Sequence, residues 1–80
     1  MNDEMILHRV IEVFATMTDS DDEITAESEL MEDLGISSMD VLFLISSLEE
    51  EFKVKVPEKM IRKMVTIEDV AEIICKLVNK

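Results

Sequence analysis

The stretch DLGISSMDVLFLISSLEEEF, residues 33–52, decides the fold of this chain, because a turn gives way to a helix within it. It contains the only glycine, Gly35, followed by two adjacent serines and a long apolar run. Ser37 has the chemistry of an N-cap, and Asp40 stands three residues later, as a capping box requires. We therefore predict a helix over residues 38–52.

The apolar side chains of this segment recur at helical spacing, and its three glutamates cluster at the end. We expect the glutamates on the water side and a buried stripe of Met39, Leu42, Ile45, Leu48 and Phe52, with Val41, Phe43 and Leu44 making further sides apolar. Ser38 then occupies the first helical position, near free N–H groups that favour an attached anion. Alternatively, both serines only mark the start of the helix.

The segments on either side of residues 33–52 also favour helices. Residues 3–17 carry apolar side chains at helical spacing, namely Leu7, Val10 or Ile11, Phe14 and Met17. Residues 18–35 are polar and acidic, so we expect a long loop held to the core by Ile24, Leu30 and Leu34. Loops of this length in compact domains are often functional.

The charge changes sign after residue 52, at KVKV. Pro57 suits the first position of a short basic helix near residues 58–64. Thr66 and Asp69 form a second capping-box pattern before a last helix, whose expected stripe is Ile67, Val70, Ile73 or Ile74, and Leu77. No segment favours a strand. The sequence predicts one all-α domain over residues 1–80, a small four-helix bundle of three main helices and a short third one, with a long first loop.

Composition narrows the function. The chain carries a net charge of −11, with 15 acids and one base in residues 1–52, which argues against nucleic acid and for basic protein partners. Seven methionines and few aromatic residues predict an aliphatic, Met-rich core. No apolar run is long enough to span a membrane, and acids precede the first apolar stretch, unlike a secretory signal. The single Cys75 is expected to be a core residue in a cytoplasmic, monomeric protein.

Catalytic and metal sites are not indicated. The acidic loop lacks the glycine and the final glutamate of a calcium loop when numbered from Asp19. The segment GISSM lacks the second glycine of a nucleophile elbow, and no histidine except His8 is available as the general base of a catalytic triad. We therefore expect neither an enzyme nor a metal site.

The stretch EDLGISSMDVLFLISSLEEEF, residues 32–52, resembles the central motif of acyl carrier proteins. ITAESELMEDLG looks like the first loop of that family, and VPEKMIRKMVTIEDVAEII like its third and fourth helices. The resemblance implies that Ser38 carries a 4′-phosphopantetheine arm from coenzyme A, whose thiol holds an acyl group as a thioester between the helices. A phosphopantetheinyl transferase would load the arm, and acyl-transferring enzymes would act on the cargo, in fatty acid or polyketide-type biosynthesis.

Four features depart from the family pattern. Ser37 replaces an aspartate, Met39 a leucine and Phe43 a frequent acid, and the third helix is basic. Because of these changes, a specialised carrier that serves a polyketide or other biosynthetic cluster fits the sequence about as well as a carrier of housekeeping fatty acid synthesis. The partner-facing residues that we expect are Ser37, Met39, Asp40, Phe43, Glu49, Glu50 and Glu51. Two alternatives remain open, an aminoacyl, D-alanyl or peptidyl carrier, and an unmodified acidic interaction domain of the same fold.

Overall fold

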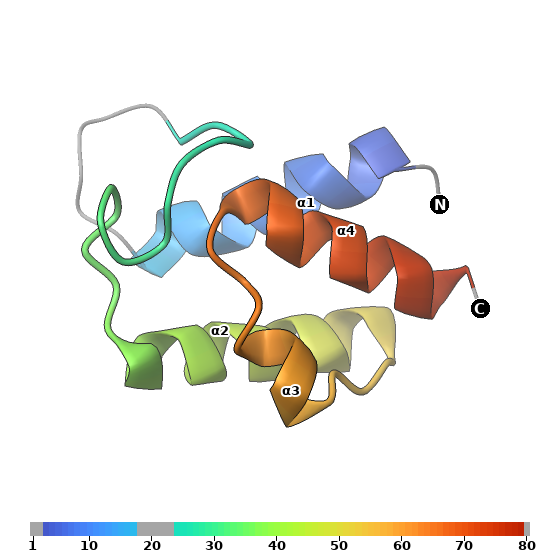
Figure 1. Cartoon of the computed structure of the whole chain (residues 1–80). Coiled ribbons are helices and arrows are strands. Elements are labelled where there is room, and N and C mark those ends of the chain that lie inside the picture. The colour runs from blue at the N-terminus through green and yellow to red at the C-terminus, as the bar shows by residue number, and fades with distance from the viewer. Residues whose placement is uncertain (1–2, 18–23, 80) are drawn as a thin grey trace.

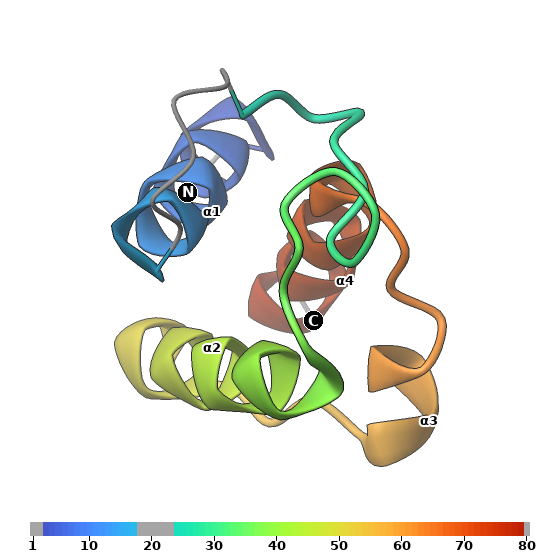
Figure 2. The same cartoon turned by 90° about the vertical axis from the view of Figure 1, so that its left-hand side faces the viewer.

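The computed structural model describes residues 3–17 and 24–79. They form four helices: α1 (Asp3–Met17), α2 (Ser38–Phe52), α3 (Glu58–Ile61) and α4 (Ile67–Val78). Helix α4 packs most extensively on α1, and α2 lies across the core from this pair (Figure 1). Figure 2 shows the three long helices around a common centre, with the short α3 beside α2 and α4. The fold is thus the small helical bundle that the sequence predicts.

In the part of the chain that the structure describes, fifteen apolar side chains form the core, and every long helix contributes to it. They are Ile6, Val10, Phe14, Leu30, Ile36, Val41, Leu44, Ile45, Leu48, Val56, Met64, Ile67, Val70, Ala71 and Ile74. The core is aliphatic, as expected, but the prediction that it is rich in methionine is wrong. Met5, Met31 and Met39 are exposed, and Met64 is the buried methionine of the described residues.

The buried face of α2 differs from the predicted one. Met39 is 76% exposed and Leu42 is 47% exposed, so the prediction that both are buried is wrong. The buried residues are Val41, Leu44, Ile45 and Leu48. This set has the same helical spacing as the predicted stripe, and because α2 is apolar on several sides, periodicity alone cannot choose between them.

The other two long helices follow the prediction more closely. In α1, Val10 and Phe14 are fully buried, whereas Leu7 is half-buried and the side chain of Met17 lies outside the described residues. In α4, Ile67 and Val70 are buried, as predicted. The sequence left open whether Ile73 or Ile74 is buried, and the structure buries Ile74. A capping box fixes where α4 begins: the Asp69 N–H donates to the Thr66 Oγ1 at 3.2 Å, and the Thr66 N–H donates to the Asp69 carboxylate.

The long loop is held to the core at its predicted anchors. Leu30 is buried, and Ile24 and Leu34 pack against the core in half-buried positions. The loop also bonds to the segment before α4, because the Leu30 N–H donates to the Val65 oxygen at 2.9 Å and the Ile67 N–H to the Ser28 oxygen at 3.0 Å. Residues 18–23 of the predicted loop lie outside the described residues.

Helix α3 is shorter than predicted. Pro57 stands just before it, with φ −60° and ψ 145°, rather than at its first position. After Ile61 the chain continues as a turn, in which the Met64 N–H bonds to the Ile61 oxygen at 3.1 Å. Within residues 3–17 and 24–79, no helix is long and apolar enough to cross a membrane.

Candidate functional site

The candidate site begins at the turn that leads into α2. Gly35 has a φ of +67°, in the left-handed region that glycine adopts without strain. The Ile36 N–H then bonds to the Leu30 oxygen at 3.1 Å, and the Ile36 side chain is buried. The turn is thereby anchored on both sides of the glycine, which fixes where the following serines emerge. Sequence reasoning missed Ile36, although an isolated apolar residue between a glycine and two serines is a signal of an anchor.

Ser37 and Asp40 cap the start of α2, as predicted. The Asp40 N–H donates to the Ser37 Oγ at 3.2 Å, and the Ser37 N–H donates to the Asp40 Oδ2 at 3.4 Å. Ser38 is therefore the first residue of the helix, and it is exposed. The two adjacent serines have different surroundings, because Ser37 serves the helix cap while Ser38 faces solvent and a groove.

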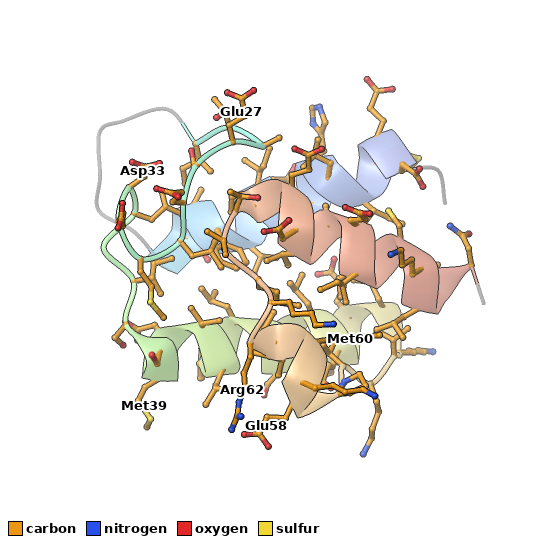
Figure 3. All side chains as sticks on the ribbon, viewed as in Figure 1. Glu27, Asp33, Met39, Glu58, Met60 and Arg62 are labelled. Carbon is orange, nitrogen blue, oxygen red and sulfur yellow. The ribbon has the colours of Figure 1, made fainter. Side chains whose placement is uncertain are left out.

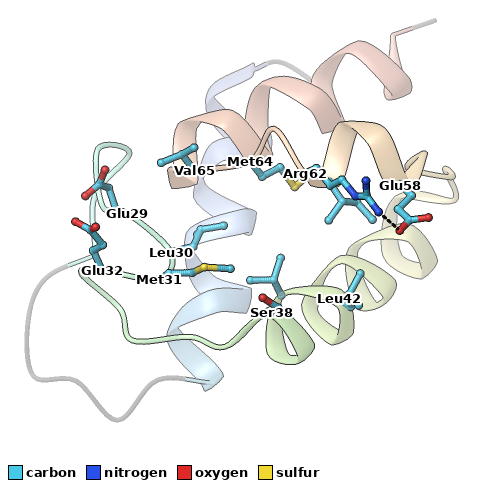
Figure 4. Close-up of a pocket in the computed structure, with 12 residues that line it drawn as sticks. Glu29, Leu30, Met31, Glu32, Ser38, Leu42, Glu58, Arg62, Met64 and Val65 are labelled. Carbon is cyan, nitrogen blue, oxygen red and sulfur yellow. Dashed lines mark hydrogen bonds and ion pairs between the residues drawn. The ribbon is translucent and has the colours of Figure 1, made fainter.

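A groove of about 580 Å³ adjoins Ser38 (Figure 4). Helix α2, the loop, α3 and the segment before α4 all contribute to it. Its lining is Glu29, Leu30, Met31, Glu32, Ser38, Val41, Leu42, Glu58, Ile61, Arg62, Met64 and Val65. Among the described residues that line the groove, Ser38 supplies the one side-chain hydroxyl. The apolar members form the walls, so the groove can cover a carbon chain that starts at Ser38.

The charged members of the lining stand at opposite ends of the groove. Glu29 and Glu32 lie on the loop, whereas Arg62 and Glu58 lie on the side of α3 (Figure 4). The neighbouring carboxylate of Glu32 raises the pKa of Glu29. At the other end, the Arg62 Nη2 lies 3.1 Å from the Glu58 Oε1. The groove thus has an acidic end and an end with a guanidinium.

Exposed apolar side chains surround the site on α2. Met39 directly follows Ser38, and Phe43 is 61% exposed one turn further along the helix. Figure 3 shows Met39, Glu58 and Arg62 on the same side of the molecule, pointing away from the core. Clusters of exposed apolar side chains rimmed by charges are typical of surfaces that bind other proteins.

The three glutamates at the end of α2 do not form one common surface. Glu49 is half-buried, and its Oε2 accepts from the Val56 N–H at 2.7 Å. Glu51 pairs with Arg9 of α1, with the Arg9 Nη2 and the Glu51 Oε1 2.6 Å apart. Glu50 is exposed. Of the four predicted partner-facing acids, Glu49 and Glu51 therefore have structural contacts inside the chain, as does the capping residue Asp40.

The remaining candidates lie away from the groove. His8 is exposed on α1, and Cys75 is half-buried on α4, where burial raises the pKa of its thiol to about 11. A thiol with such a pKa is a poor nucleophile at neutral pH. In the part of the chain that the structure describes, no three His, Cys, Asp or Glu side chains form a group that could hold a metal ion.

Comparison with known proteins identifies the family. The family model described as a phosphopantetheine attachment site matches residues 8–74. An acyl carrier protein of Campylobacter jejuni subsp. jejuni (strain 81-176) is 45% identical over 56 residues, which cover 70% of this chain and 73% of that relative. The chain belongs to the acyl carrier protein family.

Other relatives and a solved structure agree with this assignment. Acyl carrier proteins of Campylobacter concisus and Campylobacter fetus are 44% and 42% identical, over 68% and 66% of this chain and 70% and 69% of theirs. The fold matches a solved acyl carrier protein from Enterococcus faecalis with a TM-score of 0.80, at 23% identity and over 96% of this chain and 99% of that one. That likeness shows the fold.

Family membership fixes the general role. Acyl carrier proteins are carriers rather than enzymes, and their working form bears a covalently attached 4′-phosphopantetheine. Such carriers interact with a phosphopantetheinyl transferase and with acyl-handling enzymes. The arm supplies a terminal thiol that holds cargo as a thioester. This chain therefore needs an accessible attachment residue and a surface that partner enzymes can dock on.

Proposed function

We propose that Ser38 is the attachment residue, and that this carrier tethers acyl intermediates on its arm for fatty acid or polyketide-type biosynthesis. The observation that carries the proposal is the position of Ser38, exposed at the first position of α2 and on the lining of the groove. A hydroxyl there is open to a transferase. A phosphodiester formed on it would lie close to the positive end of the helix dipole.

The capping contacts support Ser38 over Ser37. The Ser37 Oγ accepts the Asp40 N–H, and a bulky ester on this oxygen would disturb the cap. The Ser38 hydroxyl has no such duty in the capping box. The chain thus separates two tasks between adjacent serines, so that Ser37 holds the helix start and Ser38 takes the arm.

The groove supports a role for the apolar residues beside Ser38. Val41, Leu30 and Met64 form a buried floor, and Leu42 and Val65 form partly exposed walls. An acyl chain held on the arm would cover these walls and lose contact with water, which is favourable for apolar surface. On this proposal the groove shelters part of the cargo between transfers.

The docking surface that we propose lies on α2 around Ser38. Met39 and Phe43 offer apolar contact area to partner enzymes with basic surfaces. Glu50 offers an exposed carboxylate, and so does Asp40, one oxygen of which also accepts the Ser37 N–H. Ser37 belongs to this surface by its position beside the arm. The structural contacts of Glu49 and Glu51 leave these two a smaller share in docking than the sequence predicts. We further propose that the carrier acts as a monomer in the cytoplasm.

The experiment is intact-mass measurement after incubation with coenzyme A, magnesium and a broad-specificity phosphopantetheinyl transferase. The parent protein should gain one phosphopantetheine, Ser38→Ala should gain none, and Ser37→Ala should still be loaded. Circular dichroism of Ser38→Ala should match the parent, because the replaced side chain is exposed. Loading of Ser38→Ala would disprove the assigned residue. Failure of the parent with several transferases would leave an unmodified interaction domain as the better function.

A further inference from the structure

Arg62 is the one cation among the described residues that line the groove, and its place is unusual for so acidic a chain. The other charged lining residues are Glu29, Glu32 and Glu58. Arg62 directly follows α3, across the groove from Leu42 of α2 (Figure 4). Ser38 lies one helical turn before Leu42 on the same wall. A chain that leaves Ser38 along this wall therefore runs toward Arg62.

The guanidinium of Arg62 is available to a second partner. Its ion pair with Glu58 is an i,i+4 contact at the surface, with side-chain exposures of 78% and 76%. Exposed pairs of this kind contribute little to stability, so exchanging the partner costs little. The contact at 3.1 Å uses one N–H group, whereas a guanidinium has five. Arg62 can thus donate to an acceptor in the groove without destabilising the fold.

The opposite end of the groove disfavours the oxygen acceptors to which Arg62 can donate. Glu29 and Glu32 lie close enough that the second carboxylate raises the pKa of the first. This end therefore repels carboxylates and other negatively charged oxygens. Between the two ends, Leu42, Ile61 and Val65 offer only apolar contacts. The groove is electrically asymmetric along its length.

We propose that Arg62 is a specificity-determining residue, which directs acyl cargo bearing a carbonyl or carboxylate oxygen beyond its thioester group toward the α2–α3 end of the groove. The cargo oxygen accepts from the Arg62 guanidinium, and its carbon chain covers Leu42 and Ile61. A fully saturated chain contacts the same walls but gains nothing from Arg62. The inference rests on the proposed attachment at Ser38, and it narrows the cargo to partly oxidised acyl groups.

The test compares two cargoes of equal length, octanoyl and β-oxo-octanoyl, each loaded on the protein from the corresponding coenzyme A thioester. The readout is protection of the thioester from hydroxylamine, expressed relative to the free acyl-pantetheine so that intrinsic reactivity cancels. Arg62→Leu removes the donor and extends the apolar wall. Lys63→Leu is the matched control, because Lys63 is the adjacent exposed base and does not line the groove. The NMR signal of the Arg62 Nε–H group gives a second, direct readout.

We expect the parent and Lys63→Leu to protect the oxo cargo about three- to tenfold more than Arg62→Leu does, the range for a charged hydrogen bond that solvent partly screens. Octanoyl protection should not fall in Arg62→Leu. The Arg62 Nε–H signal should shift with the oxo cargo only. Equal protection of the oxo cargo in the parent and in Arg62→Leu would overturn the proposal. So would an Arg62 Nε–H shift that is already complete when the arm carries no cargo. If the parent protein gains no mass on loading, the proposed attachment at Ser38 is refuted instead.

Discussion

Ser37 and Asp40 bond to each other twice across the first turn of α2, with the Asp40 N–H on the Ser37 Oγ at 3.2 Å and the Ser37 N–H on the Asp40 Oδ2 at 3.4 Å. This reciprocal pair satisfies two N–H groups that the helix itself leaves without partners. It also holds Ser38, the first of the two residues between them, at an exposed helix start. Thr66 and Asp69 repeat the arrangement at the start of α4.

Replacing the cap should lower stability without abolishing the carrier. Ser37→Ala removes the Oγ acceptor, so we expect the free energy of unfolding to fall by about 1 kcal/mol. Urea denaturation measures this loss, and Thr66→Ala should show a similar one at the second cap. A Ser37→Ala protein as stable as the parent would contradict the capping role.

Gly35 should resist replacement for conformational reasons alone. Its φ of +67° disfavours side chains, while a Cβ built on it would meet no atom within 4 Å. Gly35→Ala should therefore cost about 1–2 kcal/mol of unfolding free energy from backbone strain. Gly35→Asn should cost less, because asparagine tolerates this region better. Equal losses for the two variants, measured in urea, would show that the strain argument is wrong.

Truncating a side chain should cost much more unfolding free energy on the buried face of α2 than on its exposed face. Leu44 is 1% exposed, so Leu44→Ala should lower the unfolding free energy by about 2–5 kcal/mol through lost contacts and a cavity. Leu42→Ala, on the exposed groove wall, should cost well under half of that. The same urea experiment measures both. A larger loss for Leu42→Ala would restore the face that the sequence predicts.

This contrast also shows how far sequence reasoning reaches here. Both capping boxes follow from short patterns in which each residue acts on a near neighbour, and both were predicted correctly. The buried face of α2 was not, because Met39, Leu42 and Phe43 are as apolar as the residues that are buried. Only packing into the core that α2 shares with α1 and α4 selects the face. The charged ends of the groove could not be predicted from the sequence either, because only the tertiary structure brings Glu29 and Arg62 to one groove.

The pH dependence of stability should include a contribution from Asp69. N–H groups of Val65 and Thr66 donate to its carboxylate and lower its pKa below the ordinary value of 3.8. A lowered folded-state pKa stabilises the fold above pH 3.8, and this contribution disappears as the pH falls through the folded-state pKa. Asp69→Asn should therefore lose stability at pH 6 relative to the parent, and the gap should narrow by about pH 3. Thermal melting at the two pH values checks this, and a constant gap would count against it.

Loading by a transferase should depend on both charge and Phe43. The chain carries a net charge of −11, so the second-order rate constant for loading should fall as salt screens attraction to a basic partner.

Phe43→Ser should lower this rate at every salt concentration while leaving the salt slope unchanged, because it removes apolar contact and no charge. Its stability should stay within about 0.5 kcal/mol of the parent, since Phe43 is exposed. His8→Ser, an exposed substitution on α1, is the control and should load at the parent rate. A flat salt response would exclude acidic steering, and parent-like loading of Phe43→Ser would remove Phe43 from the docking surface.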